Sequence, residues 1–216
     1  MPRGQLILIE GLDRSGKSTQ SQVLFEKFSP DSSLVKFPNR ETKIGSIINE
    51  YLTDSDFHLS DQSAHLLFSA NRWELAQSII DDLNEGKFVV LDRYIYSGIA
   101  YSLAKSKQSS VQPEMSSVDW LYSPDKGLPK PDLTIFLTLD LKELGNRKGW
   151  GEERYEKEEF QKTVKSCFEE VFKQHDKIKS IDVNGKDIEQ VTALIWAELE
   201  AHGATTLTER AIEKFE

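Results

Sequence analysis

Short apolar runs alternate with longer segments of helical periodicity along the 216 residues of this chain. Continuous apolar runs, such as Leu6 to Ile9, indicate strands that are buried on both faces of a sheet. Apolar residues spaced three and four apart indicate helices that bury one face. The expected strands cover about residues 5–10, 34–37, 88–91, 133–139 and 180–183, and the expected helices about 17–28, 44–52, 60–84, 158–177 and 188–199, with another beginning near 97. This alternation predicts an α/β fold with a five-stranded parallel sheet and helices on both faces.

Three segments fall outside this alternation. Residues 105–117 are rich in Ser and Gln, and we expect a surface loop or insertion there. Residues 147–157 combine glycines with many charges, which fits a small lid, although composition alone favours an ordinary exposed loop. The last dozen residues form a polar tail, for which a helix is one option. The length suits a single domain over residues 1–216 that carries this lid.

Composition and charge argue against several classes of protein. The net charge of −9 disfavours a nucleic-acid-binding surface, which is normally basic. No apolar run approaches the ~18 residues that span a bilayer, and Met1 to Gly4 is too short for a signal peptide before the first strand. The single cysteine, Cys167, excludes an intrachain disulfide and is expected in the core. We therefore expect an intracellular protein with no nucleic-acid or membrane partner, located in the cytoplasm, with the nucleus as a further location.

The strongest motif is Gly-Leu-Asp-Arg-Ser-Gly-Lys-Ser at residues 11–18, which matches the phosphate-binding pattern G-x-x-x-x-G-K-[ST]. It follows a predicted strand and opens a predicted helix, so backbone N–H groups and the helix N-terminus can bind phosphate. Lys17 can reach the outer phosphates of ATP, and Ser18 can ligate Mg²⁺. The expected ATP-binding residues are Gly11, Asp13, Arg14, Ser15, Gly16, Lys17, Ser18 and Thr19.

Two variable positions inside this loop carry charges. Asp13 would repel phosphate if it faced inward, so we expect its carboxylate to point elsewhere, toward a hydroxyl. Arg14 is a second fixed cation, which can bend over a transferred phosphoryl group. The motif alone supports equally well the alternative that these positions tolerate any residue.

Further charged residues follow the other strands at the edge where open α/β sheets bind ligands. Arg40 comes just after the second strand, and Asp92 and Arg93 follow the third. An aspartate there can hold Mg²⁺ through water, and an arginine can bind a second phosphate in bidentate fashion. The alternatives are a solvated loop arginine at Arg40 and a local ion pair between Asp92 and Arg93.

The long helix carries Phe68 and Arg72 on one face, because they are four residues apart. An arginine is rarely buried without a partner. A base that stacks on Phe68 and is hydrogen-bonded by Arg72 would supply one. Alternatively, Arg72 extends from a tilted helix to solvent.

Taken together, these segments resemble the thymidylate kinases, in particular the eukaryotic-type members. The matching segments are residues 8–20, 36–40, 65–74, 91–101, 130–133 and 151–156. The match in the long helix is the most specific, because many families share the phosphate-binding loop. Lys148, Gly149 and Trp150 depart from the pattern that the resemblance leads us to expect in the lid.

The resemblance implies a P-loop kinase fold with a lid, ATP and dTMP as substrates, Mg²⁺, and a homodimer. It implies that Arg14, Lys17, Asp92 and Arg93 are catalytic and that Ser18 and Asp92 hold Mg²⁺. It also implies that Arg147 packs on adenine and that Asp13 meets the 3′-hydroxyl of the sugar. The residues implied for dTMP are Asp13, Phe37, Arg40, Phe68, Arg72, Arg93, Ser97, Gly98, Tyr101, Tyr155 and Gln161.

Two other functions compete with this one. A deoxynucleoside kinase, or another nucleoside-monophosphate kinase, would share the phosphate-binding loop and the Asp-Arg after a strand. A nucleotide switch such as a GTPase would need a guanine-reading Asn-Lys-x-Asp motif, which the chain lacks.

Overall fold

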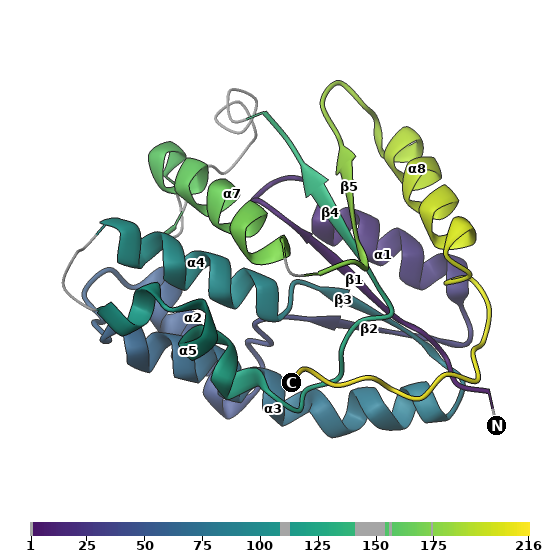
Figure 1. Cartoon of the computed structure of the whole chain (residues 1–216), viewed down its shortest axis with the longest axis horizontal. Helices are drawn as coiled ribbons and strands as arrows, with labels where there is room; N and C mark the ends of the chain where they lie inside the picture. The colour runs from purple at the N-terminus through teal and green to yellow at the C-terminus, as the bar shows by residue number, and fades with distance from the viewer. Residues whose placement is uncertain (1, 109–112, 141–153, 156, 174) are drawn as a thin grey trace.

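A five-stranded, wholly parallel sheet forms the centre of the computed structural model, which describes residues 2–108, 113–140, 154–155, 157–173 and 175–216 (Figure 1). The strand order is β2-β3-β1-β4-β5. The strands are β1 (Leu6–Gly11), β2 (Ser32–Lys36), β3 (Phe88–Asp92), β4 (Leu133–Thr138) and β5 (Ile178–Asp182). The predicted fold class is confirmed, and the predicted strands differ from the observed ones by no more than about two residues at either end.

Helices cover both faces of this sheet. They are α1 (Lys17–Phe28), α2 (Lys43–Thr53), α3 (Asp61–Asn84), α4 (Ile95–Gln108), α5 (Val118–Tyr122), α7 (Glu158–Phe172) and α8 (Ile188–Ala201), with 3₁₀ turns η1 (Pro113–Ser116) and η2 (Ser123–Asp125). Helices α1 and α8 pack together on one face, and α4 packs against α7 and α3 on the other (Figure 1). β1 is buried along its whole length because it lies at the centre of the sheet and is covered on both faces.

The strands place the ends of β1 and β3 at the same edge of the sheet. Ile9 pairs with Asp92 across the two strands, and the Arg93 amide donates to the Ile9 carbonyl. Because both strands run in the same direction, the loop after Gly11 and the turn after Asp92 lie side by side. This edge therefore carries both charged motifs that the sequence predicts.

The segment over residues 105–117 differs from the expected loop. Lys105 to Gln108 complete α4, and Pro113 to Ser116 form η1. Residues 109–112 lie outside the described part of the chain. Met115 is 1% exposed, so this segment is anchored to the core rather than held at the surface.

The C-terminal tail is extended where a helix was one option. Thr208 bridges to Arg3, and Lys214 bridges to Pro129. Phe215 packs into the main core with 6% of its surface exposed. Its burial explains why this polar segment is held against the body of the protein. Cys167 is fully buried in the same core, as predicted.

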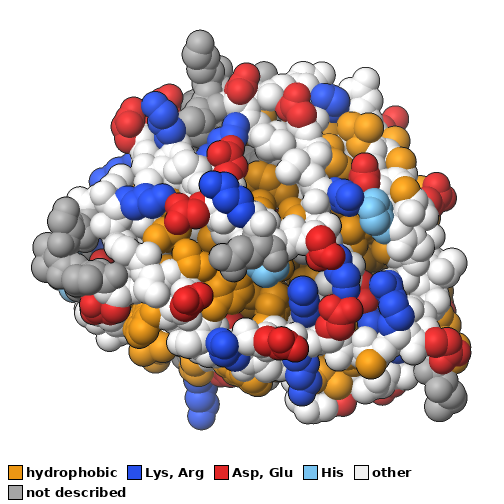
Figure 2. Space-filling model, viewed as in Figure 1, with side chains coloured by type: hydrophobic (Ala, Val, Ile, Leu, Met, Phe, Trp, Pro, Cys, Tyr) orange, Lys and Arg blue, Asp and Glu red, His pale blue; other side chains and the backbone are white. Residues whose placement is uncertain are grey.

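Charges are mixed on the face that carries α4, α5 and α7. On the described part of this face, acidic and basic side chains lie interspersed among apolar ones (Figure 2). None of the helices in the described part of the chain is long and apolar enough to cross a membrane.

Candidate active site

The phosphate-binding loop joins β1 to the N-terminus of α1, and its backbone depends on glycine. Gly16 caps α1 with a φ of 94°, a conformation that other residues rarely adopt. A Cβ at Gly11 would lie 2.6 Å from the Leu137 carbonyl oxygen and 2.7 Å from Ser15 Oγ. The chain can therefore turn here only because both positions are glycine.

Lys17 is a buried cation beside this loop. Its Nζ donates to the Leu12 carbonyl oxygen within the loop. Burial, reinforced by the nearby charge of Arg93, lowers the pKa of Lys17 to about 7. A phosphate bound in the loop would favour the charged form and so bind to a protonated Lys17.

Ser18 and Asp92 come together as predicted, although they are far apart in sequence. The Ser18 hydroxyl donates to Asp92 Oδ2 at 2.6 Å. Within the described residues no group of three or more His, Cys, Asp or Glu side chains could hold a metal ion. Ser18 and Asp92 nevertheless fit Mg²⁺, which usually binds one or two protein oxygens and completes its shell with water and substrate phosphate.

Arg93 pairs with Asp13, not with its neighbour Asp92. Its Nη2 donates to Asp13 Oδ1, and its Nη1 donates to Gly11 O and Ser97 Oγ, each at 3.1 Å. Arg93 also has a φ of 66°, which is unusual for a residue with a Cβ. The alternative of a local ion pair between Asp92 and Arg93 is therefore wrong.

Asp13 is the centre of a network that joins the loop to α4 and α7. Its Oδ2 accepts from the Tyr101 hydroxyl at 2.8 Å and from Gln161 Nε2 at 2.7 Å. Although burial opposes ionisation, Arg93 and Lys17 hold the pKa of the Asp13 carboxyl below its ordinary value. Asp13 is thus an ionised acceptor that faces a hydroxyl, as expected, and that hydroxyl belongs to Tyr101.

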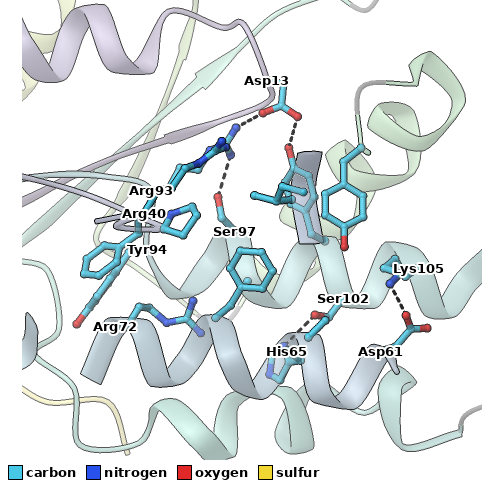
Figure 3. A pocket seen from close by; sticks show the side chains of 18 of the residues that line it. Asp13, Arg40, Asp61, His65, Arg72, Arg93, Tyr94, Ser97, Ser102 and Lys105 are labelled. Atoms are coloured by element: carbon cyan, nitrogen blue, oxygen red, sulfur yellow. Dashed lines mark hydrogen bonds and ion pairs between the residues drawn. The ribbon is translucent and has the colours of Figure 1, made fainter. Parts of the chain in front are cut away.

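A pocket opens next to this network, between α3 and α4 (Figure 3). It is lined by all the residues implied for dTMP except Gln161, which contacts Asp13 from α7. Those lining residues are Asp13, Phe37, Arg40, Phe68, Arg72, Arg93, Ser97, Gly98, Tyr101 and Tyr155. We call this the acceptor pocket. Residues that the sequence scatters over about 140 positions therefore share one cavity.

A second, more open pocket lies over the phosphate-binding loop and includes Arg14, Lys17, Ser18 and Asp92. We call it the loop pocket. The residues that line both pockets are Asp13, Phe37, Pro38, Arg40 and Arg93. Arg40 also donates to Asn49 Oδ1 at 3.0 Å. Two arginines, Arg40 and Arg93, therefore lie at the boundary between the two pockets.

Arg72 does not extend to solvent, so that alternative is wrong. It is 2% exposed and forms a bidentate ion pair with Asp125, from Nε at 3.0 Å and from Nη2 at 2.6 Å. A Cβ at Gly98 would lie 2.9 Å from Arg72 Nη1, so glycine lets α4 approach the guanidinium. Asp125 lies 53 residues from Arg72 in a 3₁₀ turn, and no pattern in the sequence marks it as the partner of Arg72.

The far end of the acceptor pocket holds further polar residues that no sequence motif predicts. Lys105 pairs with Asp61 and donates to the Tyr51 hydroxyl at 2.9 Å. That hydroxyl lies 2.9 Å from the hydroxyl of Tyr155. Lys105 belongs to the segment for which the sequence predicts a surface loop, and a lysine in a surface loop does not indicate a binding site.

Most of the predicted lid, including Arg147 and Lys148 to Trp150, lies outside the described residues. Arg154 is described, and it binds the C-terminus of α2. Its Nε donates to Tyr51 O, and its Nη2 to Asp54 O and Phe57 O, each at 2.9 Å. The bond to Tyr51 O satisfies a carbonyl group that the end of α2 leaves without an intrahelical partner, and the other two bonds hold the segment that follows the helix.

The phosphate-binding loop lies beside a separate pocket, and two arginines line both the loop pocket and the acceptor pocket. This arrangement defines a P-loop kinase whose second substrate is an anion. Comparison with known proteins agrees with this class. The model of the thymidylate kinase family matches residues 9–195. This chain belongs to the thymidylate kinase family.

Relatives from several eukaryotes are similar along most of their length. The thymidylate kinase of Schizosaccharomyces pombe is 49% identical over 80% of this chain and 79% of its own. The thymidylate kinase of Homo sapiens is 42% identical over 86% of this chain and 88% of its own. Among solved structures, the thymidylate kinase of Candida albicans superimposes with a TM-score of 0.94 at 56% identity and covers the whole of both chains.

Proposed function

We propose that this protein transfers the γ-phosphoryl group of ATP to dTMP, giving dTDP and ADP on the route to dTTP. The observation that carries the proposal is the placement of Arg40 and Arg93 at the boundary of the loop and acceptor pockets. Two phosphate groups must approach each other for transfer, and fixed cations between them reduce their repulsion. A kinase for an uncharged nucleoside can share the Asp-Arg after a strand, but its acceptor carries no phosphate for a second arginine such as Arg40 to bind.

On the ATP side, we assign binding to Gly11, Ser15, Gly16, Lys17, Ser18 and Thr19, together with Arg147. The backbone amides of the loop orient the phosphates, and Lys17 neutralises the outer ones. Ser18 and Asp92 would hold Mg²⁺, which supplies positive charge to the oxygens of the transferred phosphoryl group when it is bound. Arg14 lines the same pocket and contributes a second cation over that group.

On the acceptor side, we assign the 5′-phosphate to Arg40 and Arg93 and the 3′-hydroxyl to Asp13. The base stacks on Phe68, and Arg72 donates to its carbonyl edge from the guanidinium N–H groups that Asp125 does not take. The remaining assigned residues, which shape the pocket or orient Asp13, are Phe37, Ser97, Gly98, Tyr101, Tyr155 and Gln161. Together they fix the phosphate, sugar and base of one nucleotide.

We also propose a single domain over residues 1–216, a homodimer, and a cytoplasmic location with the nucleus as a further one. The homodimer rests on the family resemblance. Light scattering of the purified protein would test it, because a monomer has a mass of 24.7 kDa.

The proposed reaction is tested by following ADP and dTDP formation from MgATP with each of dTMP, dUMP, dCMP, dAMP and dGMP. We expect dTMP to be the preferred acceptor, and chelation of Mg²⁺ to stop turnover. Lys17→Ala is the control for the loop site, since it removes the phosphate-neutralising ammonium. An enzyme that prefers another of these monophosphates would be a different nucleoside-monophosphate kinase.

A further inference from the structure

Glu10 is a fully buried carboxyl group near the end of β1 that accepts three hydrogen bonds from the start of α4. Its Oε1 accepts from the backbone amides of Tyr94 and Ser97, each at 3.0 Å, and its Oε2 accepts from the Ser97 hydroxyl at 2.6 Å. Glu10 lines neither the loop pocket nor the acceptor pocket. A carboxyl group is rarely buried without partners, so its role lies in the contacts that it makes to α4.

The first of these contacts completes the N-terminus of α4. The first backbone N–H groups of a helix have no intrahelical partners. The side chain of the residue before the helix usually accepts from one of them, and Ser, Thr, Asp and Asn serve best there. In α4 that residue is Tyr94, whose ring packs against Phe37 with the ring centroids 5.4 Å apart. Glu10 therefore supplies from β1 the acceptor that the helix itself lacks.

The same contacts hold the backbone of Arg93. Its φ of 66° is a conformation that a residue with a Cβ keeps only where the surroundings hold it. On one side, the Arg93 amide donates to the Ile9 carbonyl oxygen at 3.0 Å. On the other side, the amide of Tyr94 donates to Glu10. Two consecutive residues of β1 thus fix the turn from which the Arg93 side chain extends.

Glu10 also reaches the guanidinium of Arg93 through one serine. Arg93 Nη1 donates to Ser97 Oγ at 3.1 Å (Figure 3). A guanidinium has no acceptor atom, so Ser97 must turn a lone pair toward Arg93 and its proton elsewhere. Glu10 Oε2 receives that proton. The carboxyl group therefore fixes the orientation in which Ser97 accepts from Arg93.

This link holds in either protonation state of Glu10. Burial raises the pKa of Glu10, and the charge of Arg93, the Ser97 hydroxyl and the amides of Ser97 and Tyr94 oppose the rise. If Oε2 carries a proton, that proton occupies the same place between Oε2 and Ser97 Oγ. Ser97 keeps a second lone pair for Arg93 in both cases.

We propose that Glu10 positions Arg93 for the phosphate of the acceptor nucleotide, through the turn before α4 and through Ser97. The inference rests on the proposed function, in which Arg93 binds the 5′-phosphate, and it adds a positioning residue that touches no substrate. A guanidinium that is already held loses little freedom when it binds an anion. Removing Glu10 should therefore weaken recognition of the phosphate and leave recognition of the nucleoside unchanged.

The test compares the dissociation constants of dTMP and thymidine, measured by calorimetry, because the two ligands differ only in the phosphate. Ser97→Ala removes the acceptor of Arg93 and leaves both amide bonds to Glu10. We expect it to lower the ratio of the Kd of thymidine to the Kd of dTMP by roughly tenfold, the value of one hydrogen bond to a charged group. Ser106→Ala is the matched control and should leave both Kd values unchanged, because Ser106 is a buried serine of α4 that bonds Ser116 and lines neither pocket.

Two substitutions of Glu10 test the positioning role. Glu10→Met keeps an unbranched side chain of similar length but removes all three acceptor contacts. We expect it to lower the same ratio by roughly tenfold or more, and to lower kcat with MgATP and dTMP. Glu10→Gln keeps an oxygen for the two amides and an N–H for Ser97 Oγ, so it should retain most of the ratio. A merely structural role would weaken dTMP and thymidine alike and leave the ratio unchanged.

The remaining outcomes separate this inference from the proposed function. If the wild type phosphorylates dTMP but Glu10→Met keeps the wild-type ratio, the inference is overturned and the proposed function stands, whether or not Ser97→Ala lowers the ratio. If the wild type does not phosphorylate dTMP, the proposed function fails and the inference fails with it. Thermal melting identifies a Glu10→Met protein that does not fold. Glu10→Asp, which withdraws the carboxyl group from α4 by one methylene, then takes its place with the same expected loss.

Discussion

The guanidinium of Arg72 and the carboxylate of Asp125 form a bidentate ion pair in the protein interior, with Nη2 and Oδ2 2.6 Å apart. The pair joins α3 to the turn η2 and holds Arg72 against the acceptor pocket. Ser69 also donates to Asp125 Oδ1 at 2.7 Å, so the carboxylate is bonded from two residues of the same helix. Asp125 therefore stabilises the fold and orients the residue assigned to the base.

Removing the charge of Asp125 should be strongly destabilising. Asp125→Asn leaves the Arg72 guanidinium buried without a counter-charge, and we expect the free energy of unfolding to fall by roughly 3 kcal/mol. Denaturant unfolding measures this loss. The matched control is Glu170→Gln, which breaks the exposed Lys107–Glu170 pair and should change stability by less than about 1 kcal/mol. Equal losses in the free energy of unfolding in the two variants would show that burial of the ion pair does not determine its contribution to stability.

Phe68 should act on dTMP and not on ATP, because it lines the acceptor pocket and not the loop pocket. Phe68→Ala is expected to raise KM for dTMP by an amount equivalent to roughly 1–3 kcal/mol of base stacking. Steady-state kinetics with each substrate varied in turn measures the effect. Leu67→Ala is the control, since Leu67 packs in the same small cluster but does not line the pocket. A parallel rise in KM for ATP would mean that Phe68 is only a packing residue.

Tyr101 should set the preference for deoxyribose over ribose through the bulk of its ring beneath the sugar. Tyr101→Ala is expected to narrow the ratio of kcat/KM for dTMP to that for ribothymidylate. Tyr101→Phe keeps the ring but removes the 2.8 Å bond to Asp13, so it should leave the ratio near that of the wild type. If the two variants shift the ratio equally, the hydroxyl and not the bulk controls the choice of sugar.

Arg14 should contribute to turnover more than to substrate binding. Its charge lies in the loop pocket, where negative charge develops on the migrating phosphoryl group. Arg14→Gly is expected to lower kcat by ~10³-fold or more, with KM for dTMP little changed. The φ of 59° at Arg14 suits glycine, so the substitution should not strain the loop.

Arg14→Lys separates charge from geometry. It should rescue turnover only in part, because an ammonium cannot bridge two oxygens as a guanidinium does. Wild-type kcat in Arg14→Gly would remove Arg14 from the mechanism. Arg147 would then be the better candidate, since Arg154 already binds the end of α2.

The sequence predicted those parts of the fold that depend on neighbouring residues or on a periodic pattern of apolar residues. The buried run of β1, the glycines of the phosphate-binding loop and the face of α3 each follow from neighbouring residues. The meeting of Ser18 with Asp92 was also predictable, because parallel strands bring their ends to one edge.

The parts that could not be predicted depend on contacts between distant, individually ordinary residues. Asp125 and Ser102 lie 53 and 37 residues from their partners Arg72 and His65, and neither stands in a recognisable motif. Phe215 is the buried apolar residue of the C-terminal tail, and one apolar residue has no periodicity. Lys105 continues α4 because Lys, Ser and Gln are compatible with a helix, and this last turn is only partly exposed, with Ser106 buried. Composition alone predicts a loop for the same residues.

The most direct test of the account compares dTMP with thymidine as acceptor for MgATP, with products separated and identified. Arg40 and Arg93 line the boundary with the loop pocket, so the account requires an acceptor that carries a phosphate. We predict that dTDP forms from dTMP with a kcat/KM at least ~10³-fold above that for dTMP formation from thymidine, because a site with committed polar groups rejects an analogue that lacks their partner. A kcat/KM for thymidine that equals or exceeds the kcat/KM for dTMP would contradict the proposal that the acceptor carries a phosphate.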